Sequence, residues 1–140
     1  ISINGAQHGY FNCSRGVRQG DPLSPLLFCI AEEVLSRGIS KLVENGQLDL
    51  IKGSRTCHVP SHSLYADDVM IFCNGKLSGL EALRVLFTRY AHCSGQFINA
   101  TKSTIFGGGI PQARLSHIAN LLGFTVGTYP FIYLGVPIFK

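Results

Sequence analysis

Two adjacent carboxylates, Asp67 and Asp68, are the residues of this sequence best suited to chemistry. They interrupt a strongly apolar stretch, residues 64–73, whose two flanks have the composition of β-strands. Such a break predicts a tight β-hairpin with the aspartates at its turn, and with Tyr65 and Ile71 packed into the core or against a neighbouring helix. Like charges held side by side repel each other and lose hydration, and a divalent cation relieves that cost. Hard carboxylate oxygens favour Mg²⁺, with water and substrate phosphates completing its coordination shell.

A solvated turn is the structural alternative for the same two residues. Asp is a frequent turn residue because its side chain hydrogen-bonds to the neighbouring backbone. On this stretch alone the metal site and the solvated turn both stay open, so the elements that would position the pair have to be considered.

Length and composition limit the classes of protein to consider. The 140 residues fit a single domain. A hydrophobic fraction of 46% beside only 14% charged residues indicates faces that meet other protein segments. No apolar run is long enough to cross a bilayer, and the first residues lack the pattern of a secretory signal. We therefore expect an intracellular protein without a membrane anchor.

The five cysteines are odd in number, widely spaced and without a Cys-x-x-Cys pair, which argues against a disulfide framework. Cys57, His58 and His62 lie close together in the sequence. They are candidate zinc ligands, but no second cluster has suitable spacing. We expect them to be separate buried or half-buried residues.

Charge is distributed unevenly along the chain. No acidic residue follows Glu81, whereas Arg84, Arg89, Lys102, Arg114 and Lys140 do. A one-sided positive segment attracts polyphosphate, which makes nucleic acid the natural partner. The alternative is that these cations are ordinary solvated surface.

The N-terminal part of the sequence predicts a hairpin over Ile1–Cys13, with a turn at Asn4-Gly5, followed by a helix. A polar, glycine-flanked loop leads into that helix, which has Asp21 or Ser24 as its cap and runs to about Glu44. Helix starts attract anions, so the loop residues can contact a nucleotide or template phosphate. A capped helix with incidental arginines is the alternative. The loop residues concerned are Arg15, Arg18 and Gln19.

The remaining elements alternate between short strands and helices. Strands are expected at 48–52, on both sides of Asp67-Asp68, at 96–99, 103–106, 131–134 and 136–139; helices are expected from a capping box at 78–81 to Gly95 and from Pro111 to Gly123. This order predicts an α+β fold, a split βαβ sheet of the ferredoxin-like kind with helices on one face.

Together these stretches resemble the palm of reverse transcriptases, most closely those of plant non-LTR retrotransposons of the LINE type. The resemblance is carried by Tyr65-Ala66-Asp67-Asp68, by the Arg-Gly-x-Arg-Gln-Gly-Asp-Pro-Leu-Ser-Pro block within residues 15–28, by Gly95-Gln96-Phe97-Ile98-Asn99 with Lys102-Ser103, and by Tyr133-Leu134-Gly135-Val136-Pro137. The blocks occur in the family's order across nearly the whole chain.

The resemblance implies RNA-directed DNA polymerase activity by two-metal nucleotidyl transfer onto a primer 3′-hydroxyl. Asp67 would be the main ligand and Asp68 the supporting ligand of Mg²⁺, with Mn²⁺ as the alternative ion. Lys102 would protonate pyrophosphate or orient the nucleotide, unless it only caps a strand end. The implied partners are an RNA template, a DNA primer and dNTPs, and the implied location is the nucleus. The family also places Arg15, Arg18, Gln19 and Gly20 at the nucleotide and template, and Tyr133, Leu134 and Gly135 at the primer.

The same resemblance implies that residues 1–140 are a partial palm. The family has an earlier block whose aspartate is a third metal ligand, and it has fingers before that block and a thumb after the primer grip. We therefore expect an incomplete fragment that is inactive alone. Two alternatives stay open: an inactive retroelement relic that still binds nucleic acid, and the palm of a group II intron maturase or retron reverse transcriptase.

Overall fold

Helices and short strands alternate along the computed structural model, which describes residues 2–9, 16, 20–53 and 58–139. The described helices are α1 (Ser24–Glu44), α2 (Leu77–Ser94), the short 3₁₀ helix η1 (Ala100–Lys102) and α3 (Gln112–Leu122). The described strands are β1 (Ser2–Ile3), β2 (Ala6–Gln7), β3 (His62–Tyr65), β4 (Asp68–Ile71), β5 (Thr104–Ile105), β6 (Thr125–Val126), β7 (Phe131–Tyr133) and β8 (Val136–Ile138). This mixture confirms the predicted α+β class.

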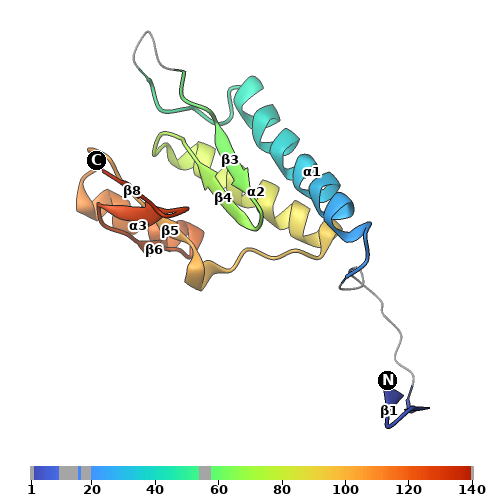
Figure 1. Cartoon of the computed structure of the whole chain (residues 1–140). Helices are drawn as coiled ribbons and strands as arrows, with labels where there is room; N and C mark the ends of the chain where they lie inside the picture. Colours follow the sequence, from blue (N-terminus) through green and yellow to red (C-terminus); the bar gives the residue numbers. More distant parts are fainter. Residues whose placement is uncertain (1, 10–15, 17–19, 54–57, 140) are drawn as a thin grey trace.

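The described strands pair as four two-stranded ribbons. β1–β2, β3–β4 and β7–β8 are antiparallel, while β5–β6 is parallel. Within the described residues the ribbons stay separate and do not join into one continuous sheet. The β1–β2 hairpin lies apart from the other elements (Figure 1), and it has the Asn4-Gly5 turn predicted for it, with φ of 53° and 80°.

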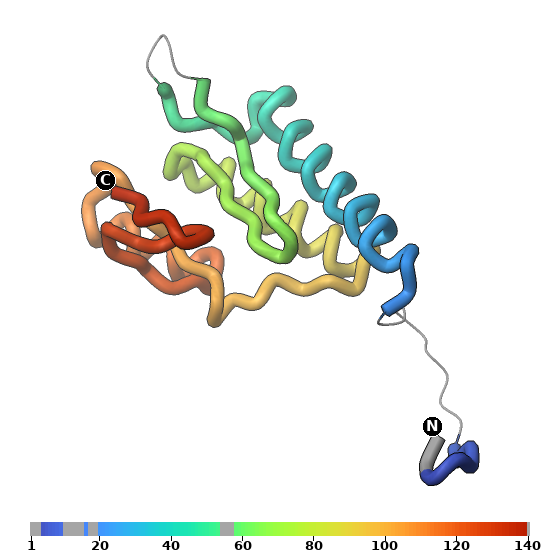
Figure 2. The backbone as a smooth tube through the Cα atoms, viewed as in Figure 1, coloured from blue at the N-terminus to red at the C-terminus, as the bar shows by residue number. Residues whose placement is uncertain are grey.

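Helices α1 and α2 lie side by side, with the β3–β4 ribbon across them and α3 with the later ribbons as a neighbouring group (Figures 1 and 2). The core between them is apolar and draws on all three helices. Ile39 of α1 and Leu48, which follows α1, are its most deeply buried side chains. The other buried members are Leu35, Leu80, Leu83 and Ile118. Burial of these side chains, rather than strand pairing, holds the elements together.

The ends of the helices follow from local chemistry. Pro25 sits in the first turn of α1, where its missing N–H costs nothing, and the Asp21 carboxylate accepts a hydrogen bond of 2.9 Å from the Leu23 N–H just before it. Gly95 and Gly123 end α2 and α3 in the left-handed conformation, with φ of 76° and 72°. Gly46 follows α1 with φ of 67°, so each glycine predicted to stop a helix lies just beyond its end.

Three of the expected elements differ in the structure. Strand 48–52 is reduced to a single bridge between Leu50 and Cys73. The prediction of a capping box at 78–81 is wrong. Helix α2 starts at Leu77 without a side-chain cap hydrogen bond, and Glu81 forms an ion pair with Arg84 instead. The strand at 96–99 is absent, and Asn99 instead caps η1, where its side chain accepts a hydrogen bond from the Lys102 N–H.

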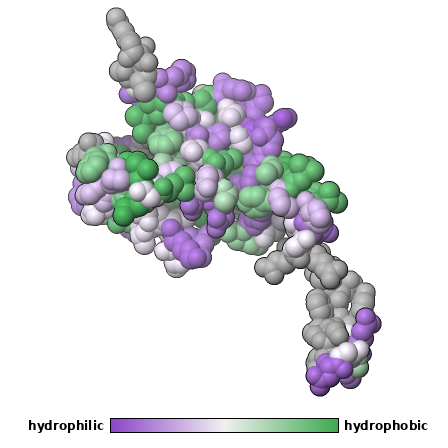
Figure 3. Space-filling model, in the orientation of Figure 1, coloured by the Kyte–Doolittle hydropathy of each residue, from purple (hydrophilic) through white to green (hydrophobic). Residues whose placement is uncertain are grey.

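The N-terminal half of α1 presents apolar side chains to solvent. Figure 3 shows hydrophobic residues gathered on the surface there. They recur at the three- and four-residue spacing of one helix face and are 47–61% exposed: Leu23, Leu26, Leu27, Ile30 and Val34. The opposite face of α1 carries Leu35 and Ile39 into the core, so both faces of the helix are apolar.

Candidate functional site

The β3–β4 ribbon is the predicted hairpin, and it places the two aspartates at its turn. Tyr65 pairs with Asp68, which leaves Ala66 and Asp67 as the two turn residues. Ala66 has φ of 48°, as the first position of a tight hairpin turn requires. The turn therefore lies one residue earlier than predicted: Asp67 is in it and Asp68 is the first residue of β4.

Both carboxylates are exposed, and neither pairs with a Lys or Arg among the described residues. The turn points along α1 towards the end of the molecule where that helix begins (Figure 1). Two adjacent negative charges thus lie exposed at the tip of the ribbon, unpaired within the part of the chain that the structure describes, where they can accept a cation.

Burial increases along the ribbon away from this tip. Ile71 packs against the core, as expected. Tyr65 was expected to pack in the same way, and that prediction is wrong, because its side chain is 60% exposed beside the turn. The apolar run 64–73 is therefore buried mainly at its base.

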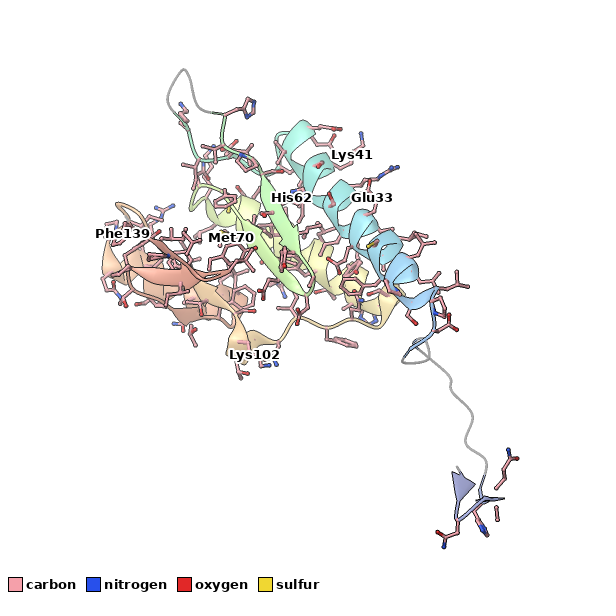
Figure 4. The ribbon with its side chains drawn as sticks, in the orientation of Figure 1. Glu33, Lys41, His62, Met70, Lys102 and Phe139 are labelled. Carbon is pink, nitrogen blue, oxygen red and sulfur yellow. The ribbon has the colours of Figure 1, made fainter. Side chains whose placement is uncertain are left out.

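The base of the ribbon is fixed by His62, the first residue of β3. Ser36 Oγ on α1 lies 2.8 Å from Nε2 of His62, and Ser61 Oγ lies 2.8 Å from Nδ1. Burial lowers the pKa of His62, so at neutral pH the ring donates through one nitrogen and accepts through the other. Figure 4 shows His62 on the ribbon next to α1. The exposed tip therefore stands on a packed, hydrogen-bonded base.

The carboxylate oxygens at the tip of the ribbon are of the type that Mg²⁺ takes as ligands. Hard carboxylate oxygens without a competing cation are the ligands this ion takes, usually one or two of them with water and phosphate. Among the described residues no group of three or more His, Cys, Asp or Glu side chains comes together. The zinc alternative has no support there either, since His62 is held by serines and His58 is exposed. Cys57 lies outside the described residues.

The predicted nucleotide contacts are described only in part. Arg15, Arg18 and Gln19 lie outside the described residues. Gly20 is exposed near the start of α1, with φ of 80°. Lys102 ends η1 and is exposed, on the segment that runs from the end of α2 towards β5 (Figure 4).

The predicted primer contacts lie on a different ribbon from the aspartates. Leu134 and Gly135 form the two-residue turn between β7 and β8, with φ of 49° and 80°. The Tyr133 hydroxyl is buried without a hydrogen-bond partner among the described residues. The structure thus brings Asp67 and Asp68 together at the tip of one ribbon and carries the other described candidates on separate elements.

Comparison with known proteins decides the family. The family model described as reverse transcriptase (RNA-dependent DNA polymerase) matches residues 1–138. The chain belongs to the reverse transcriptase family. Its helices and small ribbons are consistent with a fragment of the palm of these enzymes, and the family's activity is RNA-directed DNA polymerisation.

One curated relative shares part of this reverse transcriptase sequence. The chain is 48% identical over 66 residues to the Uncharacterized mitochondrial protein AtMg01250 of Arabidopsis thaliana. The match covers 47% of this chain and 54% of the relative. The chain therefore spans about half the length of the curated relative it matches.

Within this reverse transcriptase chain, part of the basic surface already has partners. Arg84 forms an ion pair with Glu81, at 2.9 Å from its Nε. The Arg114 Nη2 donates to the Gly75 carbonyl at 2.9 Å. No ion-pair partner of Arg89 or Lys102 is found in the part of the chain that the structure describes. The sequence alone does not distinguish Arg84 and Arg114, which have partners, from Arg89 and Lys102.

No membrane-spanning element is found in the described part of the chain: none of its helices has the length and apolar character that crossing a bilayer requires.

Proposed function

We propose that this chain is palm sequence of an RNA-directed DNA polymerase of the plant non-LTR, LINE type, and that Asp67 and Asp68 bind its catalytic Mg²⁺. The observation that carries the proposal is the turn of β3–β4, where two exposed carboxylates stand on a packed base without a cationic partner among the described residues. The sequence blocks that resemble LINE reverse transcriptases support the finer assignment, and so does the identity to a plant relative.

In this proposal Asp67 and Asp68 supply the negative charge that binds the metal ion. As hydrated carboxylates at a fixed turn they bind the ion without first breaking an ion pair. Asp67 is the main ligand and Asp68 the supporting one. When bound, Mg²⁺ lowers the pKa of the primer 3′-hydroxyl and neutralises charge on the triphosphate, and Mn²⁺ is the alternative ion.

The remaining candidates bind and orient the substrates, which are an RNA template, a DNA primer and dNTPs. Gln19 contacts the incoming nucleotide, and Arg15, Arg18 and Gly20 face its phosphates or the template. Lys102, exposed at the end of η1, orients the nucleotide or protonates pyrophosphate. Tyr133, Leu134 and Gly135 form the primer grip at the turn of the β7–β8 ribbon.

Residues 1–140 form a partial palm in this proposal, and further segments of the parent polymerase supply a third carboxylate, the fingers and the thumb. The proposed site of action is the nucleus. The second candidate is an inactive relic that retains nucleic-acid binding. It draws on the absence of acidic residues after Glu81.

Metal titration tests the core of the proposal. Mn²⁺ serves as a paramagnetic substitute for Mg²⁺, and its binding to the chain is measured by electron paramagnetic resonance. Asp67→Asn and Asp68→Asn should each weaken binding, Asp67→Asn more strongly. The matched control is Glu44→Gln, which removes an exposed carboxylate already paired with Lys41.

Two outcomes of this titration separate the candidates. Mn²⁺ binding that both aspartate variants leave unchanged would remove the metal site from the proposal. Metal binding at the turn, followed by primer extension when the chain is joined to the remaining polymerase segments, would reject the relic.

A further inference from the structure

A hydrogen-bonded group links three parts of the chain around the last turns of α2. The Tyr90 hydroxyl lies 3.3 Å from Oε1 of Glu32 on α1, and it also hydrogen-bonds to Oε1 of Gln96, which follows α2. All three side chains are half-buried. The two partners are 58 and 6 positions from Tyr90 in the sequence.

The Tyr90 hydroxyl faces more hydrogen-bond acceptors than it has protons to donate. A tyrosine hydroxyl has one hydrogen and can donate it to one acceptor at a time. An ionised glutamate and an amide oxygen are both acceptors. Two acceptors therefore face one donor, and the group is satisfied only when one of them brings a proton.

Glu32 is the side chain of this group whose surroundings favour the protonated form. Its second oxygen, Oε2, is buried and has no partner among the described residues. A buried carboxylate oxygen without a donor loses far more hydration energy than the carbonyl oxygen of a neutral acid. Burial raises the pKa of Glu32, although the hydrogen bond from Tyr90 opposes that shift.

The charged groups around Glu32 do not offset this burial. On α1 the neighbouring Glu33 pairs with Arg37 on the exposed side of the helix. On β3 the imidazole of His62 faces Ser36, and burial lowers its pKa, so it is neutral near pH 7. On α2 the facing group is Tyr90, whose own pKa is raised by burial and by the nearby Glu32. No Lys or Arg of the described residues pairs with Glu32.

We propose that Glu32 is held as the neutral acid, that it donates to the Tyr90 hydroxyl, and that Tyr90 in turn donates to Gln96. This chain of hydrogen bonds fastens the segment Gly95–Asn99, which runs without strand pairing between α2 and η1 (Figure 2), to both long helices. Glu32 and Tyr90 are then positioning residues for Lys102 at the end of η1. That last role rests on the proposed function, in which Lys102 contacts the nucleotide.

Ionisation of Glu32 would open this chain. The carboxylate would compete for the Tyr90 proton as a charged acceptor, and Gln96 would lose its donor. A rival arrangement turns the Gln96 amide over, so that its NH₂ donates to Tyr90 and Tyr90 donates to an ionised Glu32. That arrangement satisfies Oε1 but leaves a charged Oε2 buried without a donor.

NMR titration of the full chain distinguishes the two arrangements. The carboxyl ¹³C signal of Glu32 and the amide signals of residues 96–102 are followed from acidic to neutral pH. The proposal expects Glu32 to titrate above the ordinary glutamate value and the segment amides to shift with the same midpoint. Glu32→Gln, which keeps a donor toward Tyr90, should hold the segment signals at their low-pH positions throughout.

Two further variants separate positioning from simple packing. Tyr90→Phe keeps the ring but removes the hydroxyl, so the segment signals should stop following Glu32. Glu33→Gln, one position away on the exposed side, should leave both titrations unchanged. If Tyr90→Phe fails to fold, the wild type and Glu32→Gln still decide the question.

An ordinary or lower midpoint for Glu32, as the rival arrangement requires, would overturn the proposal. Segment signals that ignore the titration of Glu32 would also overturn it. The titration uses neither metal nor nucleic acid, so its failure is distinct from failure of the polymerase proposal.

Discussion

Ser36 Oγ on α1 lies 2.8 Å from Nε2 of His62 on β3. This contact joins the middle of a long helix to the first residue of the strand that leads to Asp67 and Asp68. The ribbon thus has a neutral, hydrogen-bonded base and a doubly charged, exposed tip. The charged carboxylates lie where water can solvate them, and the neutral imidazole of His62 lies at the packed end of the ribbon.

The first prediction concerns the pH dependence of stability. The folded-state pKa of His62 is lowered from 6.5 by burial, so the unfolded chain binds a proton more readily than the folded chain does. Stability should therefore fall as the pH decreases below about 6.5, until the folded pKa is passed. Urea midpoints over a pH series measure this slope.

Two variants check the assignment to His62. His62→Gln should remove that part of the slope, whereas His58→Gln, at an exposed histidine, should keep it. A slope that survives in His62→Gln would assign the acid sensitivity to other groups.

The second prediction compares two glycines. A Cβ at Gly127 would lie 2.3 Å from Cε1 of Phe106 and 2.6 Å from Cγ2 of Thr104. The Phe106 ring cannot move away easily, because it stacks on Phe131 at a centroid distance of 3.7 Å. Gly127→Ala should reduce the free energy of unfolding by about 1–3 kcal/mol, as overpacking does.

Gly38 in α1 is the matched control. Its Cβ would lie 2.7 Å from Cδ1 of Leu86, the far end of a flexible, half-buried side chain. Alanine also gains about 1 kcal/mol of helix propensity over glycine. Gly38→Ala should therefore change stability little, as measured by urea unfolding, and equal losses in the two variants would contradict the packing argument.

The third prediction concerns Tyr133, whose buried hydroxyl has no partner among the described residues. An unsatisfied buried donor costs about 1–3 kcal/mol. Tyr133→Phe should consequently unfold at the same or a higher urea concentration than the wild type. Tyr65→Phe, at an exposed ring, serves as the control. A clear loss of stability in Tyr133→Phe would mean that the hydroxyl has a partner in solution.

Turns and helix ends whose conformation depends on a few adjacent residues could be predicted from the sequence. The Asn4-Gly5 turn, the glycines after each helix and the Asp67-Asp68 hairpin all rest on the conformational preferences of a few adjacent residues. The position of the two candidate carboxylates could be predicted to the same extent, because they are neighbours in the sequence. The one-residue error at the turn reflects Ala66, whose positive φ no sequence rule favours.

Contacts between distant residues could not be predicted in this way. The parallel β5–β6 pair depends on Thr125, whose N–H donates to the Ser103 carbonyl at 3.0 Å. Strands of two residues carry no periodic signal. The contact of Glu32 with Tyr90 joins positions 58 apart. Exposure of Tyr65 likewise depends on its tertiary surroundings, which local preference does not encode.

The fourth prediction is weak, salt-sensitive binding to single-stranded nucleic acid. Arg84 is already paired with Glu81, which leaves Arg89, Lys102, Arg114 and Lys140 as the basic residues after the last acidic one. Arg114 already donates to the Gly75 carbonyl, and contacts from the other three cations give a slope of about −2 in a plot of log K against log salt. Fluorescence anisotropy with a labelled oligonucleotide at several salt concentrations measures it. Affinity independent of salt would argue against phosphate contacts.

The last prediction is that the 140-residue chain alone does not extend a primer. Its described residues gather only the two carboxylates of the β3–β4 turn, and no third acidic, histidine or cysteine ligand joins them there. Mg²⁺ dehydrates reluctantly and requires near-octahedral geometry, so two carboxylates hold it weakly. Losing a metal ligand that acts in the transition state removes several kcal/mol of stabilisation, and each 1.4 kcal/mol costs about tenfold in rate, so extension should fall below detection.

Primer extension with Mg²⁺ or Mn²⁺ measures this for the chain alone and for the chain joined to an upstream aspartate block and a downstream thumb. Activity should appear only in the joined protein, and there it should disappear in Asp67→Asn. Extension by the 140-residue chain itself, lost in Asp67→Asn, would show that the β3–β4 turn needs no further carboxylate.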